Sequence, residues 1–198
     1  PQKNCMSLWY LAVNAIAGAA VEFPVGQFFP LGGHVVATAN WTVDGGAGVD
    51  DHFVIISSEG EVAIYKGTDP ASSATFELHG VYFAGKPLGN RCFAKFGGDL
   101  VILTETGVIT LGKLLGGQSS NYNGALTSLI DGAFAEAVRY YKDNFGWLCV
   151  VYPLQNALIV NIPTTNSVSI QFVMNTITGA WCSFSGWSAL TMLVFGDN

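Results

Sequence analysis

The sequence predicts an all-β fold, arranged as part of a β-propeller with antiparallel four-stranded blades. Half of the 198 residues are hydrophobic, and 24 are glycines, which can adopt the positive φ of hairpin turns. Strand-like cycles begin near residues 34, 91, 145 and 190, a spacing in the range of propeller blades. The ten residues 14–23 also recur at 175–184, with Asn, Ile, Gly, Ala and Phe at the same positions.

Apolar runs and turn residues define the strands of the first part of the chain. Each run is bounded by Gly, Pro, Asn, Asp or Ser, which commonly end strands. We expect an N-terminal pair of strands, the last half of one blade, followed by a complete blade. These strands are expected at 7–13, 19–23, 34–43, 53–57, 61–65 and 76–83.

The same pattern continues in the second part of the chain. A second cycle starts at Arg91, a third near Gly146 and a fourth at Ala189. The sequence therefore predicts about three complete blades with part-blades at both ends, in a single domain 1–198 that is a fragment of a longer propeller protein. The strands are expected at 92–96, 100–104, 108–111, 146–152, 157–162, 169–174, 180–184 and 189–195.

Four glycines are predicted to form structural turns of these blades. Gly60 and Gly107 lie 47 residues apart in similar turns, each between two apolar runs. Gly18 and Gly179 hold the same position in the two copies of the repeated segment. Repetition of a turn indicates a repeated scaffold and not a binding motif used twice.

The segment 122–142 has the periodicity of an amphipathic helix instead of a strand. We expect a single inserted helix whose apolar stripe covers a sheet edge, where unpaired strand groups need shielding. Docking against another subunit is the alternative role of such a stripe. The stripe consists of Leu126, Leu129, Ile130, Ala133, Phe134, Ala137, Val138 and Tyr141.

Charge and hydropathy argue against several function classes. A net charge of −6 and only eight Lys and Arg residues disfavour sequence-specific nucleic-acid binding, which relies on basic side chains. No apolar run approaches the roughly 20 residues needed to cross a bilayer, so no membrane partner is expected. The cysteines lack a CxxC pair, and we expect buried reduced thiols at Cys5, Cys92, Cys149 and Cys182.

Acidic residues offer two candidate chemistries, and neither pattern is complete. Asp44, Asp50 and Asp51 flank a glycine-rich turn, but they lack the alternating ligands and final Glu of a calcium loop. Asp44, Asp51, Glu59 and Glu105 could supply paired carboxylates for glycoside hydrolysis. Glu59 and Glu105 occupy similar turns, however, which repetition explains without catalysis. We therefore predict no catalytic residue, no metal and no cofactor.

Histidine and tryptophan residues give two further sets of candidates. His34, His52 and His79 lie in separate strands or at strand edges without the spacing of a triad or zinc motif, so we expect structural roles. Trp9, Trp147 and Trp181 lie in apolar strands and are expected to pack between blades. Trp41 and Trp187 lie beside turns and are the two candidates for exposed anchors, although packing is favoured for them as well.

Several of these segments together resemble a group of tailed-phage and prophage virion proteins. The matching text covers nearly the whole chain and consists of structural motifs. The similar segments are Trp9-Tyr10-Leu11, Gly18 with Phe23-Pro24, 41–46, 57–70, 85–89 and 175–181.

This resemblance implies a non-enzymatic structural protein at the head-to-tail junction, similar to the plug or packaged-DNA stabilisation proteins of short-tailed phages. The implied partners are other virion proteins and further copies of the chain, and the implied location is the virion, assembled in the bacterial cytoplasm. The rival hypotheses are a carbohydrate-binding or carbohydrate-processing propeller and a ligand-binding propeller with an axial metal.

Overall fold

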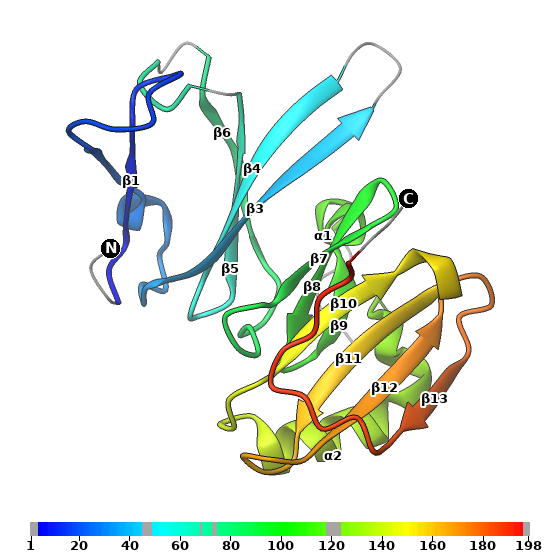
Figure 1. The fold of residues 1–198 in the computed structure, drawn as a ribbon. Helices are drawn as coiled ribbons and strands as arrows, with labels where there is room; N and C mark the ends of the chain where they lie inside the picture. The colour runs from blue at the N-terminus through cyan, green and yellow to red at the C-terminus, as the bar shows by residue number, and fades with distance from the viewer. Residues whose placement is uncertain (1–3, 45–48, 68, 73–74, 118–123, 196–198) are drawn as a thin grey trace. The chain divides into compact units, whose positions relative to one another are not determined.

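The computed structural model describes residues 4–44, 49–67, 69–72, 75–117 and 124–195. The chain divides into two compact units, Pro1–Lys86 and Pro87–Asn198. In each sheet the strands follow chain order and pair antiparallel, so each sheet is an up-and-down meander (Figure 1). The described strands form sheets of two, four, three and four strands and do not form a closed propeller.

The first unit combines a two-stranded hairpin with a four-stranded sheet. The hairpin pairs Leu8 with Phe23, and a 3₁₀ turn, η1, follows it at Gly26–Phe28. The strands are β1 (Ser7–Tyr10), β2 (Val21–Pro24), β3 (Val35–Asp44), β4 (Val49–Ser57), β5 (Glu61–Lys66) and β6 (Glu77–Phe83).

Aromatic packing joins the hairpin to one face of the four-stranded sheet. The ring of Phe23 meets Tyr65 and Phe76 edge to face, with ring centroids 5.4 and 5.6 Å apart. Tyr65 and Phe76 stack on each other at 4.9 Å, and the hairpin residue Leu8 packs against the same cluster. The hairpin β1–β2 therefore covers this face and excludes water from it.

The second unit contains a three-stranded and a four-stranded sheet, with helical segments between them. The three-stranded sheet holds β7 (Phe93–Phe96), β8 (Asp99–Thr104) and β9 (Gly107–Thr110). The C-terminal sheet, as we name it, holds β10 (Leu148–Tyr152), β11 (Ala157–Pro163), β12 (Ser169–Asn175) and β13 (Trp181–Phe184). The helical segments are α1 (Leu111–Leu115), η2 (Leu126–Ile130), α2 (Asp131–Tyr141) and η3 (Pro153–Gln155).

The helical insertion contacts a sheet edge through the polar side chain of Thr127, which is not part of the predicted apolar stripe. The buried hydroxyl of Thr127 in η2 accepts a hydrogen bond of 3.2 Å from the backbone N–H of Val108 in β9, the edge strand of its sheet. The helix begins later than the predicted residue 122, and its first turn is a 3₁₀ helix, which presents a different face from an α-helix. Leu129 is consequently 77% exposed, whereas Phe134, Ala137 and Val138 are buried.

One predicted strand and the predicted number of complete blades are wrong. The second cycle has three strands and not four, because the side chain of Thr110 accepts a hydrogen bond from Lys113 N–H and starts helix α1 after β9. The segment 189–195 forms no strand, and Leu193 and Phe195 are 83% and 95% exposed. The expected three complete blades are therefore two four-stranded sheets within the described residues.

The four predicted turn glycines all lie at hairpin connections with positive φ. Gly60 joins β4 to β5 and Gly107 joins β8 to β9, in both cases the second and third strands of a sheet, with φ of +91° and +135°. Gly18 lies between β1 and β2, and Gly179 between β12 and β13, with φ of +136° and +72°. A Cβ at Gly60 would lie 2.4 Å from the carbonyl carbon of Gly85, whereas a Cβ at Gly179 would meet nothing within 4 Å.

The different surroundings of Gly60 and Gly179 predict that alanine lowers protein stability by different amounts at these two turns. Gly60→Ala combines the unfavourable φ with a backbone clash, so we expect it to lower the free energy of unfolding by about 3 kcal/mol. Gly179→Ala, the matched control, meets only the unfavourable φ and should cost about 1 kcal/mol. Urea unfolding monitored by circular dichroism measures both values. Equal costs would contradict the close approach of the Gly60 turn to Gly85.

Tyr65 provides a second prediction, based on pH. Its hydroxyl is buried without a hydrogen-bond partner among the described residues, and burial raises the pKa of Tyr65 to about 12 from its usual 10.0. The unfolded chain releases this proton near pH 10 and the folded chain near pH 12, so the wild type loses stability as the pH rises through this window.

We expect Tyr65→Phe to be more stable than the wild type by about 1 kcal/mol at pH 7, because it removes an unpaired buried hydroxyl. The difference should widen between pH 10 and pH 12, since phenylalanine does not titrate. Urea unfolding at pH 7 and pH 11 measures it. A variant less stable than the wild type at pH 7 would show that the hydroxyl has a stabilising partner.

Candidate functional site

The two tryptophans predicted as exposed anchors differ in exposure. Trp187 is 52% exposed, whereas Trp41 is only 9% exposed and lies with its ring centroid 5.3 Å from that of His52. Of the tryptophans expected to pack between blades, Trp147 is buried and Trp181 is half-buried. The expected packing of Trp9 is wrong, because this side chain is 48% exposed on β1.

The described candidate carboxylates have separate local partners. Glu59 pairs with Lys86 at 2.8 Å, and Glu105 pairs with Lys142 at 3.6 Å. Asp51 accepts a hydrogen bond of 2.8 Å from the hydroxyl of Thr42 in the neighbouring strand. The side chains of Asp44 and Asp50, and the glycine-rich turn 45–48 between them, lie outside the described residues.

The histidines lie in strands or at strand edges, and the expected burial of the cysteines holds for Cys92 and Cys149 but is wrong for Cys182, which is exposed. His52 lies between Trp41 and His79, 6.0 Å from the ring centroid of His79. The backbone N–H of His34 donates to the hydroxyl of Ser58, and the backbone carbonyl of His34 accepts a hydrogen bond from the N–H of Ser58. All four cysteines are free thiols. Burial raises the pKa of Cys92 to about 12, and it also raises the pKa of Cys149. Within the described ranges, no three His, Cys, Asp or Glu side chains are grouped to hold a metal ion.

One face of the C-terminal sheet is apolar, and it is exposed at its β13 end. Its central row runs across the four strands through Val150, Ile159, Val173 and Cys182, which are register partners. Met192 packs against the buried residues Ala157, Ile159 and Val173 of this face. On the β13 side, Cys182 is exposed and Phe184 is 39% exposed. We name this surface, with Trp187 beside it, the open face.

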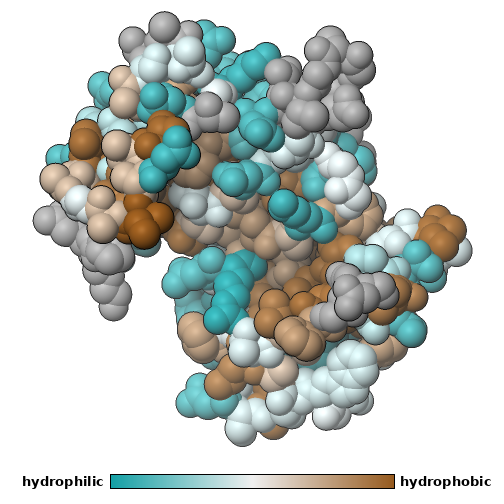
Figure 2. All heavy atoms as spheres, turned by 45° about the horizontal axis from the view of Figure 1, so that its top comes forward, coloured by the Kyte–Doolittle hydropathy of each residue, from teal (hydrophilic) through white to brown (hydrophobic). Residues whose placement is uncertain are grey.

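The open face contains a hollow of about 500 Å³. Its lining includes Ile159, Val173, Phe184 and Trp187, and no acidic or basic side chain. The rings of Phe184 and Trp187 meet edge to face with centroids 5.4 Å apart. Figure 2 shows hydrophobic residues, in brown, reaching the surface among hydrophilic ones. A hollow of this composition favours an apolar or aromatic group over a charged ligand.

A buried polar network holds the segment that carries Trp187. The amide nitrogen of Gln171 donates to the Asn161 side chain and to the backbone carbonyl of Trp187, both at 2.8 Å. Asn161 donates to the carbonyls of Gly146 at 2.9 Å and Ala189 at 3.0 Å. Sequence analysis missed both residues, although a polar residue within each of two strongly apolar strands was an available signal.

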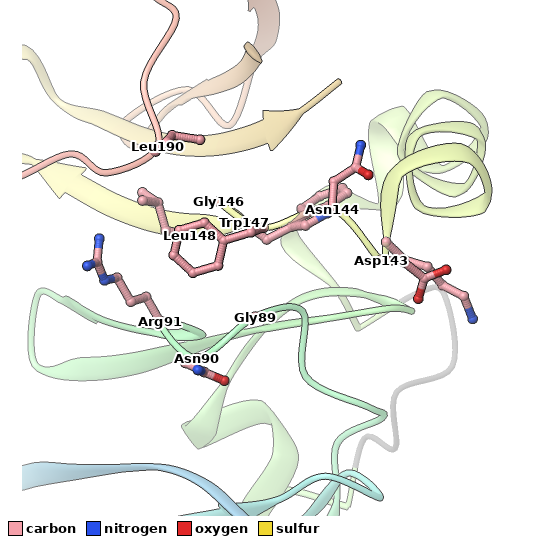
Figure 3. A pocket seen from close by; sticks show the side chains of 11 residues that line it. Gly89, Asn90, Arg91, Asp143, Asn144, Gly146, Trp147, Leu148 and Leu190 are labelled. Atoms are coloured by element: carbon pink, nitrogen blue, oxygen red, sulfur yellow. The ribbon is translucent and has the colours of Figure 1, made fainter. Parts of the chain in front are cut away.

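A second hollow, of about 380 Å³, lies between the segment before β7 and the loop between α2 and β10. Figure 3 shows Asn90 and Arg91 on one side of it and Leu148 and Leu190 on the other. Its cations are engaged within the fold, because Arg91 donates to Thr191 and Lys142 pairs with Glu105. A third hollow, of about 210 Å³, is lined by 166–169 and 188–190 and has no charged side chain.

Comparisons with known proteins identify no relative. No protein-family model matches the chain, and a search of curated proteins finds no similar sequence. In the part of the chain that the structure describes, no helix is both long and apolar enough to cross a membrane. The geometry of the open face alone therefore makes it the candidate functional site.

Proposed function

We propose that the chain is a structural protein of a tailed-phage virion, in the head-to-tail connector or tail region, and that it acts through protein interfaces and not through catalysis. The resemblance of its turn and strand segments to virion proteins supports this proposal. Two of the resembling segments fall at hairpins: 57–70 spans the β4–β5 turn, and 175–181 spans the β12–β13 turn.

The sheets support the propeller component of the proposal. Each sheet is an antiparallel meander, and two of the sheets have the four strands of a propeller blade. Gly60 and Gly107 occupy the same corner in two successive sheets, and the repeated segment forms a hairpin in both of its copies. We propose that the sheets are blades and that the β1–β2 hairpin is the outer half of a further blade.

The open face is the observation that carries the proposed function. An apolar sheet face with Phe184 39% and Trp187 52% exposed is typical of a protein interaction surface. Burial of such aromatic side chains provides much of the stability of protein interfaces. The described carboxylates Asp51, Glu59 and Glu105 have separate partners, and the hollow of the open face has no acidic lining residue, so catalysis by paired carboxylates gains no support there.

A carbohydrate-binding module is the second candidate, and the pair of Phe184 and Trp187 favours it. Aromatic faces stack on sugar rings, and this pair borders the hollow of about 500 Å³. Calorimetric titration with host surface polysaccharide would reveal binding, and Trp187→Ala should abolish it. Phe145→Ala, which alters another exposed aromatic residue, is the matched control.

The virion assignment predicts that the protein is present in assembled particles. Antibodies against the purified chain should label phage particles from the encoding bacterial strain at the head-to-tail vertex, as seen by immunogold electron microscopy. Mass spectrometry of particles purified through a density gradient should detect peptides of the chain. Particles that lack both the label and the peptides, although the gene is expressed, would contradict the virion assignment.

A further inference from the structure

Two buried cysteines from distant parts of the sequence lie next to each other in the second unit. Arg91 and Leu148 form a parallel β-bridge between the segment before β7 and strand β10. The residues that follow them, Cys92 and Cys149, are therefore neighbours in the same register. Because side chains alternate along extended chains, the two thiols lie on the same side of this contact.

The hydrogen bonds of both residues support this pairing. The carbonyl of Cys92 accepts a hydrogen bond of 2.7 Å from the backbone N–H of Leu103 in β8, so Cys92 extends the ladder of β7. The thiol of Cys149 donates to the same carbonyl at 3.8 Å, which directs its Sγ toward Cys92. Cys92 is 0% exposed and Cys149 is 4% exposed. The two thiols thus share one buried site between the three-stranded sheet and the C-terminal sheet.

This arrangement meets the geometric requirement of a disulfide. Neighbouring strands lie roughly 4.8 Å apart, and a disulfide spans roughly 4.4–6.8 Å between Cα atoms. Since Cys92 and Cys149 are register neighbours with side chains on one side, rotation of the side chains can bring the two sulfur atoms together. The backbone does not need to move for the bond to form.

We propose that Cys92 and Cys149 form a disulfide when the chain meets an oxidant, and that this bond locks the three-stranded sheet to the C-terminal sheet. With hydrogen peroxide, one thiolate attacks a peroxide oxygen, the O–O bond breaks, and the released hydroxide takes up the thiol proton as water. The second thiol attacks the sulfur of the resulting sulfenic acid, so that the S–S bond forms and a second water leaves. Two thiols and one peroxide thus give one disulfide and two waters.

Burial delays this reaction, because the thiolate is the nucleophile and both thiols are held protonated. Burial raises the pKa of Cys92 to about 12, and burial together with the neighbouring Cys92 raises the pKa of Cys149. The contact must therefore open briefly before either sulfur reacts. Cys182, which is exposed, is expected to react first.

The disulfide goes beyond the proposed function and does not depend on it. Disulfides are rare in the reducing cytoplasm and persist in oxidising surroundings, virion surfaces included. In a virion protein, this bond would be absent during assembly and would form after the particle leaves the cell. Failure of the bond to form would leave the virion assignment unchanged, and absence of the chain from particles would leave the bond unchanged.

Peptide mapping of the oxidised protein tests the proposal. The background is Cys182→Ser, which removes an exposed thiol and leaves Cys149 as the only cysteine of the tryptic peptide 143–198. The folded protein is incubated with hydrogen peroxide at temperatures up to just below its melting temperature, and free thiols are then blocked. Digestion without reductant should give peptide 92–95 joined to peptide 143–198 as the dominant cross-link.

Thermal unfolding measures whether the bond locks the fold. It joins residues 57 apart in the sequence, and the loss of chain entropy in the unfolded state should raise the melting temperature by about 5–10 °C. Dithiothreitol should reverse this rise. Cys149→Ala and Cys92→Ala in the same background are the controls, and the melting temperature of each should be the same with and without peroxide.

Three results would overturn the proposal. The first is free thiols, or sulfinic and sulfonic acids, at Cys92 and Cys149 after incubation just below the melting temperature. The second is a link between them that forms only in urea-unfolded protein or is no more abundant than links to Cys5. The third is a link that leaves the melting temperature unchanged, because the two sheets would then not be locked.

Discussion

An apolar β-sheet face must be covered by another element, and most features of this protein depend on that requirement. Exposed apolar area is unfavourable in water, by roughly 25 cal/mol per Å². In the first unit the β1–β2 hairpin covers its sheet face through the aromatic contacts of Phe23. In the second unit Met192 packs against the buried centre of the corresponding surface, whereas Cys182 and Phe184 on β13 remain exposed.

The edges of the sheets obey a similar requirement for hydrogen bonds. Unpaired backbone groups at an edge strand must find a partner or face water. At β9 the Thr127 hydroxyl supplies the partner, and a helical segment lies where another strand could have paired. Near the end of the chain, Asn161 and Gln171 bind the backbone carbonyls of Ala189 and Trp187, which holds an irregular segment next to the sheet.

Local features were predictable from the sequence, whereas features that need a distant partner were not. Positive φ at Gly60 and Gly107 follows from the turn residues themselves, and the helix follows from its periodicity. The prediction of a strand at 189–195 is wrong because a strand needs a neighbouring strand to pair with, and the alternation of apolar residues does not show whether one is present. The exposure of Trp9 was missed for the same reason: the sequence of β1 does not reveal what covers its outer face.

The native thiol of Cys182 gives the most direct test of the claim that the open face is a protein interface. Cys182 is exposed on that face, whereas Cys92 and Cys149 are buried. Alkylation by iodoacetamide can be followed at each cysteine by peptide mass spectrometry at increasing protein concentration. A covered interface predicts that the alkylation rate constant at Cys182 falls as the protein associates, while those of the buried Cys92 and Cys149 stay low at every concentration. An alkylation rate constant at Cys182 that is independent of concentration would contradict the claim.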